Sequence, residues 1–73
     1  MPEQIVKAPM KARVIEFLVQ QGDSVKEQDV VCNLEALKME VPIMAPAAGT
    51  LKKKLAEPGQ NVDAGDPLFS IET

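Results

Sequence analysis

The chain has no histidine, tryptophan or tyrosine, and it has only two phenylalanines. The lack of histidine removes both the commonest general base and the commonest metal ligand. Without tryptophan or tyrosine there is little on which a nucleic-acid base could stack, and the net charge is −3 with no basic patch. We therefore expect a domain that binds neither a metal nor nucleic acid, and that does no chemistry with its own side chains.

Long apolar runs are also missing, and the first residues, Met1-Pro2-Glu3-Gln4, do not resemble a signal peptide. We therefore expect no direct insertion into a membrane. Cys32 has no second cysteine to pair with, which is typical of a reducing compartment. These features predict a cytoplasmic protein. Its length corresponds to one domain, residues 1–73, which we expect to be monomeric in isolation.

An internal repeat is the main feature that the chain does contain. Residues 8–35 align with residues 45–72 at a constant offset of 37. Two copies of one supersecondary unit, related by a pseudo-two-fold axis, would leave residues 36–44 as the link between them. Lys38 lies in that link, where a side chain could be presented to another protein. The identical pairs are Ala8/Ala45, Pro9/Pro46, Leu18/Leu55, Gly22/Gly59, Val25/Val62, Asp29/Asp66 and Glu35/Glu72.

The secondary structure of residues 11–21 is ambiguous from local propensity. Val14, Phe17 and Leu18 have helical spacing. In the second half of the repeat the positions matching Val14 and Leu18 are again apolar, but Phe17 is replaced by Lys54. The shared pattern therefore suits a strand whose inward residues are Val14 and Leu18 as well as it suits a helix.

Other segments predict strands. Residues 30–35 and 67–72 alternate with a period of two, which indicates half-buried strands. Gly22 and Gly59 suit tight turns, and Pro42 should lie at a sheet edge or strand start because proline cannot donate to a ladder. We therefore expect an all-β domain, a flattened barrel or sandwich of two antiparallel sheets with a quasi-two-fold internal repeat. The two termini should lie at one end, and residues 36–39 should turn at the other.

The residues around Lys38 resemble the attachment motif of a known family. Glu35-Ala36-Leu37-Lys38-Met39 is similar to the Glu-Ala-Met-Lys-Met motif in the biotinyl branch of the biotinyl/lipoyl attachment domains, the biotin carboxyl carrier domains. The resemblance covers residues 5–72 and implies the barrel-sandwich hybrid fold, with the modified lysine on a hairpin turn. Three departures are Leu37 in place of methionine, Lys11-Ala12 in place of Pro-Gly, and Gln28 in place of the glycine found at the equivalent Gly65.

This resemblance implies a carrier and not an enzyme. A biotin protein ligase would join biotin covalently to Lys38. The attached biotin would then shuttle CO2 between a biotin carboxylase component and a carboxyltransferase component of a biotin-dependent carboxylase or decarboxylase. Leu37 and Met39 would give the ligase apolar contacts. Ala36, Glu35 and Glu40 complete the recognition flank, and the two glutamates would set turn geometry or recognition.

Two alternative functions remain open. A lipoyl carrier domain of a dehydrogenase complex would use the same fold and the same lysine position, although its turn typically reads Asp-Lys-Ala. An unmodified domain of this fold could instead serve only as a protein interaction module.

Several other side chains have two interpretations. Lys52, Lys53 and Lys54 could contact a partner or form a solvated strand face with one inward stem. Cys32 aligns with Phe69, which favours a buried thiol over a nucleophile. We treat Met10 and Met44 as either packing residues or contacts for a prosthetic group. If Val14 and Leu18 face inward, Ile15 and Phe17 face outward, either as a docking patch or under a neighbouring loop.

Overall fold

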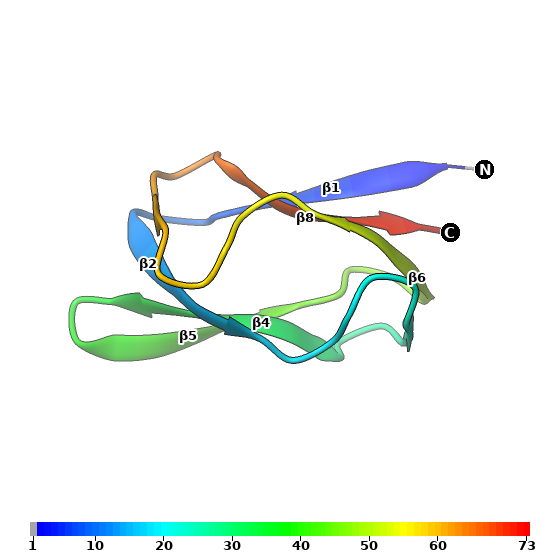
Figure 1. Cartoon of the computed structure of the whole chain (residues 1–73), viewed down its shortest axis with the longest axis horizontal. Coiled ribbons are helices and arrows are strands. Elements are labelled where there is room, and N and C mark those ends of the chain that lie inside the picture. The colour runs from blue at the N-terminus through cyan, green and yellow to red at the C-terminus, as the bar shows by residue number, and fades with distance from the viewer. Residues whose placement is uncertain (1) are drawn as a thin grey trace.

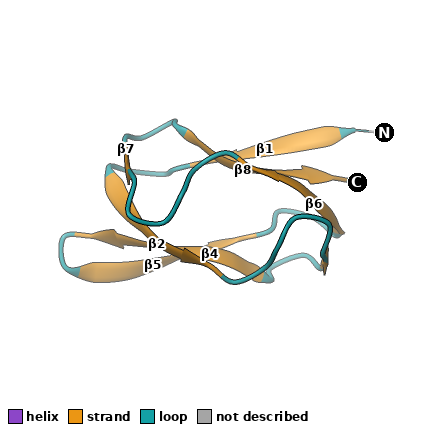
Figure 2. Ribbon diagram, in the orientation of Figure 1, coloured by secondary structure: helices purple, strands orange, loops and turns teal. Residues whose placement is uncertain are grey.

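The computed structural model describes residues 2–73 as a β-sandwich (Figure 1), and no helix occurs in this range (Figure 2). Its strands form two antiparallel sheets of four strands each, in the orders β1-β8-β6-β3 and β5-β4-β2-β7. The predicted all-β fold with two antiparallel sheets is confirmed, and the helical interpretation of residues 11–21 is excluded. The strands are β1 (Glu3–Lys7), β2 (Ala12–Phe17), β3 (Ser24–Val25), β4 (Val30–Ala36), β5 (Met39–Met44), β6 (Gly49–Lys54), β7 (Asn61–Val62) and β8 (Pro67–Glu72).

The two sheets are copies of one another. An offset of 37 residues carries β2 onto β6, β3 onto β7 and β4 onto β8, and it also carries β1 onto β5, so that one strand order becomes the other. Loop hydrogen bonds are duplicated as well. The Gly22 amide donates to the Leu51 carbonyl at 2.8 Å, and the Gly59 amide donates to the Val14 carbonyl at 2.7 Å. The loop of each half is thus bonded to a strand of the other half, which interlocks the two copies.

Strand β2 departs from the predicted inward pattern. A bulge between Val14 and Glu16 adds one residue to this strand relative to β4. The alternation shifts after the bulge, so that Phe17 turns inward and packs edge-to-face on Phe69 at 6.5 Å between ring centroids. Leu18 is left 51% exposed. The expectation that Leu18 faces inward and Phe17 outward is therefore wrong, whereas Val14 is buried and Ile15 exposed as expected.

The middle strands of the two sheets are more buried than their alternation predicts. In β4 and β8 the polar residues Asn33 and Ser70 are 9% and 1% exposed. Each belongs to a central strand and has a cross-strand neighbour on both sides; for Asn33 these are Pro42 and Glu16. The flanking side chains cover the short polar one. The half-buried interpretation is wrong for the middle of both strands.

The ends of the sandwich are arranged as the sequence predicted. The Thr73 amide donates to the Pro2 carbonyl at 3.0 Å, and Figure 1 shows both termini at the end opposite the β4–β5 hairpin. Pro42 lies in β5, an edge strand, so its missing amide hydrogen removes no bond to a second neighbour. Between the sheets lies a core of Ala8, Ala12, Val14, Val25, Val31, Cys32, Leu34, Ala36, Ile43, Ala45, Leu51, Ala56, Val62, Leu68, Phe69 and Ile71.

Candidate functional site

The β4–β5 hairpin ends in a two-residue turn made of Leu37 and Lys38. Ala36 and Met39 are the last cross-strand pair before it. Leu37 and Lys38 have φ angles of 52° and 63°. A type I′ turn requires positive φ at both central residues and usually selects asparagine and glycine. Leucine and lysine adopt this conformation at a cost of roughly 1–2 kcal/mol each, so the turn stores local strain that the hairpin ladder maintains.

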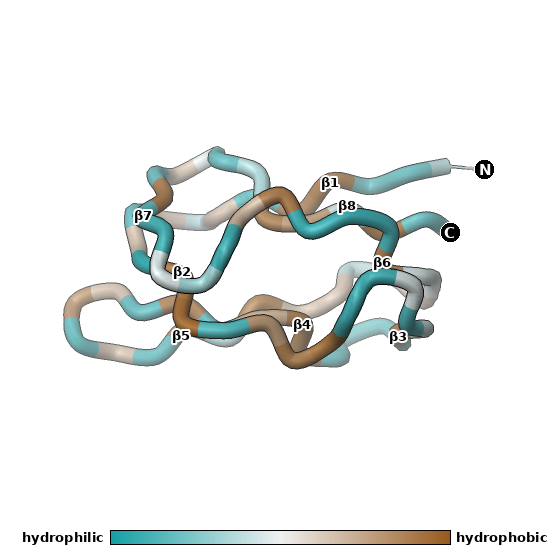
Figure 3. Tube along the Cα trace, viewed as in Figure 1, coloured by the Kyte–Doolittle hydropathy of each residue, from teal (hydrophilic) through white to brown (hydrophobic). Residues whose placement is uncertain are grey.

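The side chains at the tip of this hairpin are exposed to solvent. Leu37 is 93% exposed and Met39 69% exposed, and Lys38 between them is also exposed. Within residues 2–73 the amine of Lys38 makes no ion pair, since the two ion pairs found there are Arg13–Glu35 and Lys52–Glu72. Figure 3 shows hydrophobic and hydrophilic residues next to one another at this tip. The site is thus a free amine between two solvent-exposed apolar side chains.

An ion pair ties β4 to β2 close to the turn. The Arg13 Nη2 atom donates to Glu35 Oε1 at 2.7 Å, and Glu35 lies directly across from Glu40 on β5. Two facing carboxylates repel each other, so the guanidinium offsets the repulsion on one side. Because both partners are about half exposed (55% and 45%), the pair stabilises the fold by less than about 1 kcal/mol.

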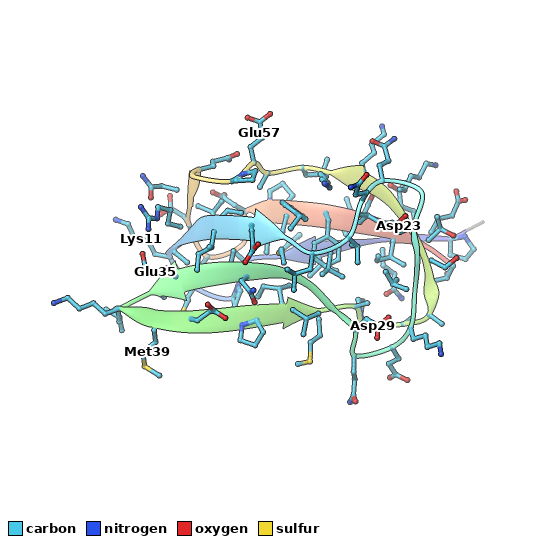
Figure 4. All side chains as sticks on the ribbon, turned by 60° about the horizontal axis from the view of Figure 1, so that its bottom comes forward. Lys11, Asp23, Asp29, Glu35, Met39 and Glu57 are labelled. Carbon is cyan, nitrogen blue, oxygen red and sulfur yellow. The ribbon has the colours of Figure 1, made fainter. Side chains whose placement is uncertain are left out.

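Arg13 is the residue of this site that the sequence does not reveal. It lies 22 positions from Glu35, and only the register of β2 against β4 brings them together. Glu35 and Lys11 lie at the same end of the molecule as Met39, whereas Asp23 and Asp29 lie at the other end (Figure 4). The Ala36 side chain is buried and fills the core beneath the turn.

The other candidate residues either lie away from the tip or already contact another side chain of this domain. Met44 pairs with Val30 at the far end of β5, and Met10 is 41% exposed. The amine of Lys54 lies 5.2 Å from the centroid of the Phe17 ring, which is consistent with an inward lysine stem. Lys52 forms an ion pair with Glu72.

Cys32 is the buried thiol that its alignment with Phe69 predicted. Its side chain is fully buried among core residues. Desolvation by this burial raises the pKa of the thiol to about 11. Because the thiolate is the nucleophilic form, the thiol is unreactive at neutral pH.

Within residues 2–73 there is no pocket, and no group of three or more metal-ligating side chains. The same residues contain no helix of the length and hydropathy needed to cross a membrane. The chemistry that this arrangement offers is that of one accessible primary amine on a pre-formed turn.

Comparison with known proteins identifies the family of this fold. Residues 4–71 match the family model described as "Biotin-requiring enzyme". The biotinylated protein TB7.3 homolog of Mycobacterium leprae is 39% identical over 66 residues, which cover 90% of this chain and 93% of that protein. The biotin carboxyl carrier protein of Streptococcus mutans is 44% identical over 64 residues, covering 88% of this chain and 49% of that protein.

A solved structure agrees with these relatives. The urea carboxylase of Kluyveromyces lactis superposes with a TM-score of 0.93 at 28% identity, covering 99% of this chain. The matched region is 6% of the urea carboxylase chain, so this chain spans only a small part of that enzyme and about half of the S. mutans protein. The match of nearly the whole chain to the family model, together with the fold, shows that this chain belongs to the biotin-requiring enzyme family.

Proposed function

We propose that this chain is a biotin carboxyl carrier domain that holds biotin on Lys38. The observation that carries the proposal is the exposed, unpaired amine of Lys38 at the tip of the β4–β5 turn, in a chain of the biotin-requiring family. The site fits the group, since amide formation needs an amine that a ligase can reach, with no neighbouring side chain in the way. When bound, biotin supplies the chemistry of taking up and releasing CO2.

The turn fixes the backbone conformation from which the amine is presented. Leu37 and Lys38 are held at positive φ by the ladder between β4 and β5, so a ligase loses little free energy in ordering them. The amine attacks through its nitrogen lone pair and loses a proton when the amide forms, so the ligase must provide a group that accepts this proton. Leu37 and Met39, on either side of Lys38, provide apolar area for that contact.

The partners follow from the same proposal. We propose that the domain is not itself catalytic and that it serves a biotin carboxylase and a carboxyltransferase after modification by a biotin protein ligase, in the cytoplasm. Two features support a non-catalytic role: the chain has no histidine, and its single cysteine is a buried, unreactive thiol. The domain contributes position and a high local concentration of the attached group.

The test is to incubate the purified chain with ATP, biotin and a biotin protein ligase and to measure its intact mass. We expect a gain of about 226 Da, the mass that amide-linked biotin adds, and peptide mapping should place it on Lys38. Lys38→Arg should abolish the gain while leaving the circular dichroism spectrum unchanged. Lys54→Arg serves as the matched control and should be labelled normally.

Three results would contradict the proposal. Label on a lysine other than Lys38 would exclude this residue as the attachment site. A gain of about 188 Da with lipoate and a lipoate ligase, and none with biotin, would identify a lipoyl carrier instead. No gain with either ligase, while a known substrate is modified in parallel, would favour an interaction domain.

A further inference from the structure

The two sheets differ at equivalent edges. Strands β1 and β5 are each the last strand of a sheet, with β8 and β4 as their respective neighbours. The 37-residue offset carries Ile5, in the middle of β1, onto Pro42 in β5. Proline has no amide hydrogen, so Pro42 protects the edge of β5 against pairing with a further strand. Strand β1 contains no proline, and its edge has no such protection.

The free edge of β1 presents the backbone groups of every second residue. The Pro2 carbonyl before this strand and the Ala8 amide after it both form hydrogen bonds to residues that flank β8. Because the backbone groups of a strand alternate between its two sides, the amides and carbonyls of Glu3, Ile5 and Lys7 point away from β8. Within residues 2–73 no strand pairs with that side of β1. An edge with free donors and acceptors is able to pair with another strand.

The side chains of the same three residues are complementary to a second copy of β1. Ile5 is 54% exposed, and the exposed side chains of Glu3 and Lys7 form no ion pair within residues 2–73. All three lie on one face of the sheet, since side chains alternate along a strand. When two β1 strands run antiparallel about Ile5, Glu3 of each copy lies opposite Lys7 of the other. Opposite charges that face each other across two strands stabilise the pair.

We infer that two copies of this chain pair through their β1 strands, antiparallel and about a two-fold axis at Ile5. The two Ile5 residues exchange backbone hydrogen bonds across the axis, and Glu3 and Lys7 of opposite copies do the same on either side of it. The apolar contact between the two Ile5 side chains lies between two ion pairs. Two sheets of four strands thereby join into one continuous sheet, in a contact that uses the same surface of both copies.

Strand β5 cannot form the equivalent contact. A pair of β5 strands about the matching axis would bring Pro42 against Pro42 without a donor on either side, and Glu40 would face the uncharged Met44. The self-complementary charges and the free donors therefore occur together only at the edge of β1, among these two equivalent strands.

The inference does not depend on the proposed function. The contact uses no residue of the turn around Lys38, which belongs to the other sheet (Figure 1). A pair of this kind differs from the monomer that we expect from the sequence, because the sequence does not show which strand lies at an edge.

Sedimentation equilibrium of the full chain at low ionic strength measures the pairing. Because a contact through single strands is small, the association should be weak, and concentrations from about 50 μM to about 2 mM are needed. The average mass of the parent chain should rise with concentration from 7.9 kDa toward twice that value. Ile5→Pro removes the outward amide without removing a bond to β8, and it should remain at 7.9 kDa throughout. Circular dichroism melts check that this variant is folded.

Charge variants test the register of the two strands. Glu3→Lys places two lysines opposite each other and should raise the dissociation constant by about tenfold, summed over the two facing pairs. The double variant Glu3→Lys/Lys7→Glu exchanges the charges and should recover the dissociation constant of the parent within about twofold. The matched control Glu40→Lys makes the same change at the equivalent position of β5 and should leave the dissociation constant unchanged.

Three results would overturn the inference. A parent chain that stays at 7.9 kDa at every concentration does not form the pair. Equal association of the parent and a folded Ile5→Pro variant would place the contact elsewhere than β1. Failure of the charge exchange to recover association would exclude the antiparallel register about Ile5. Biotinylation of Lys38 is measured separately, so none of these results bears on the proposed function.

Discussion

The β4–β5 hairpin and the β8–β1 pair occupy equivalent places in the two halves of the molecule, but they end differently. In the hairpin, Leu37 and Lys38 join Ala36 to Met39. At the other end the equivalent residues are Thr73 and Pro2, which are hydrogen-bonded to each other at 3.0 Å without a turn between them. Lys38, the proposed attachment residue, therefore lies where the two copies are joined. The two halves thus share one strand arrangement, and the candidate site lies at the one turn that has no equivalent in the other half.

The interiors of the two halves also differ at equivalent positions. Cys32 in the first half corresponds to Phe69 in the second, Ala12 corresponds to Gly49, and Gln28 corresponds to Gly65. Each pair places two residue types in one backbone environment. Substitutions at these pairs therefore test how far the two halves are energetically equivalent.

The largest effect is expected at the Cys32/Phe69 pair. Both side chains are fully buried, but Phe69 is much larger and packs against the ring of Phe17. Phe69→Ala should lower the free energy of unfolding by about 3–5 kcal/mol, and Cys32→Ala by about 1 kcal/mol. Urea unfolding of the two variants measures both values. Equal losses would mean that the two positions contribute equally to the core despite their difference in size.

The next effect is expected at Gly49. A Cβ atom there would overlap the Glu72 carbonyl oxygen and lie 2.8 Å from Ile71 Cγ2. Since a backbone atom cannot move aside easily, Gly49→Ala should destabilise the fold by about 3 kcal/mol. The reverse change at the equivalent position, Ala12→Gly, should cost less than about 1 kcal/mol. Thermal unfolding compares the two, and an unchanged melting temperature for Gly49→Ala would show that β6 and β8 can separate.

A smaller effect depends on pH and belongs to the first half alone. Burial raises the pKa of Cys32 from an ordinary value of 9.0 to about 11. Above pH 9 the unfolded chain loses this proton before the folded one, so stability is complete below pH 9 and falls as the pH rises toward 11. At pH 10.5 the loss should be about 2 kcal/mol relative to pH 8.

Cys32→Ala isolates this contribution, because every other titratable group is common to the parent chain and the variant. The parent chain should lose more stability than the variant between pH 8 and pH 10.5 in urea titrations. Parallel losses in both proteins would show that the thiol ionises as easily in the folded chain as in the unfolded one.

The smallest effect is expected at the Gln28/Gly65 pair. Both amides donate to equivalent carbonyls, and both residues have positive φ, 74° at Gln28 and 91° at Gly65. Glutamine is strained there, but glycine has more freedom to lose on folding, so Gln28→Gly should stabilise the chain by only about 0.5 kcal/mol. Gly65→Gln should destabilise it by about 1 kcal/mol. Differential scanning calorimetry would detect both shifts, and a destabilised Gln28→Gly variant would reveal a role for this side chain that its backbone conformation does not explain.

The strand pattern was only partly predictable from the sequence. The repeat indicated two equivalent sheets, and the alternation in residues 30–35 and 67–72 marked two strands correctly. The orientation of Phe17 was not predictable, because one bulged residue after Val14 reverses the alternation without leaving a signal in the residue types. The burial of Asn33 was missed for a related reason, since its cover comes from side chains on two neighbouring strands.

The sequence by itself determined the chemistry that the site can offer, the single lysine between Leu37 and Met39 at the junction of the two repeats, because residue identity and spacing are local properties. Only the tertiary structure decided what surrounds that lysine. The pairing of Arg13 with Glu35 and the grouping of Glu16, Asn33 and Glu40 on one face depend on strand register and on bulges. Register is set by the packing of the whole sandwich, since a slip of one residue would turn every side chain of a strand to the opposite face.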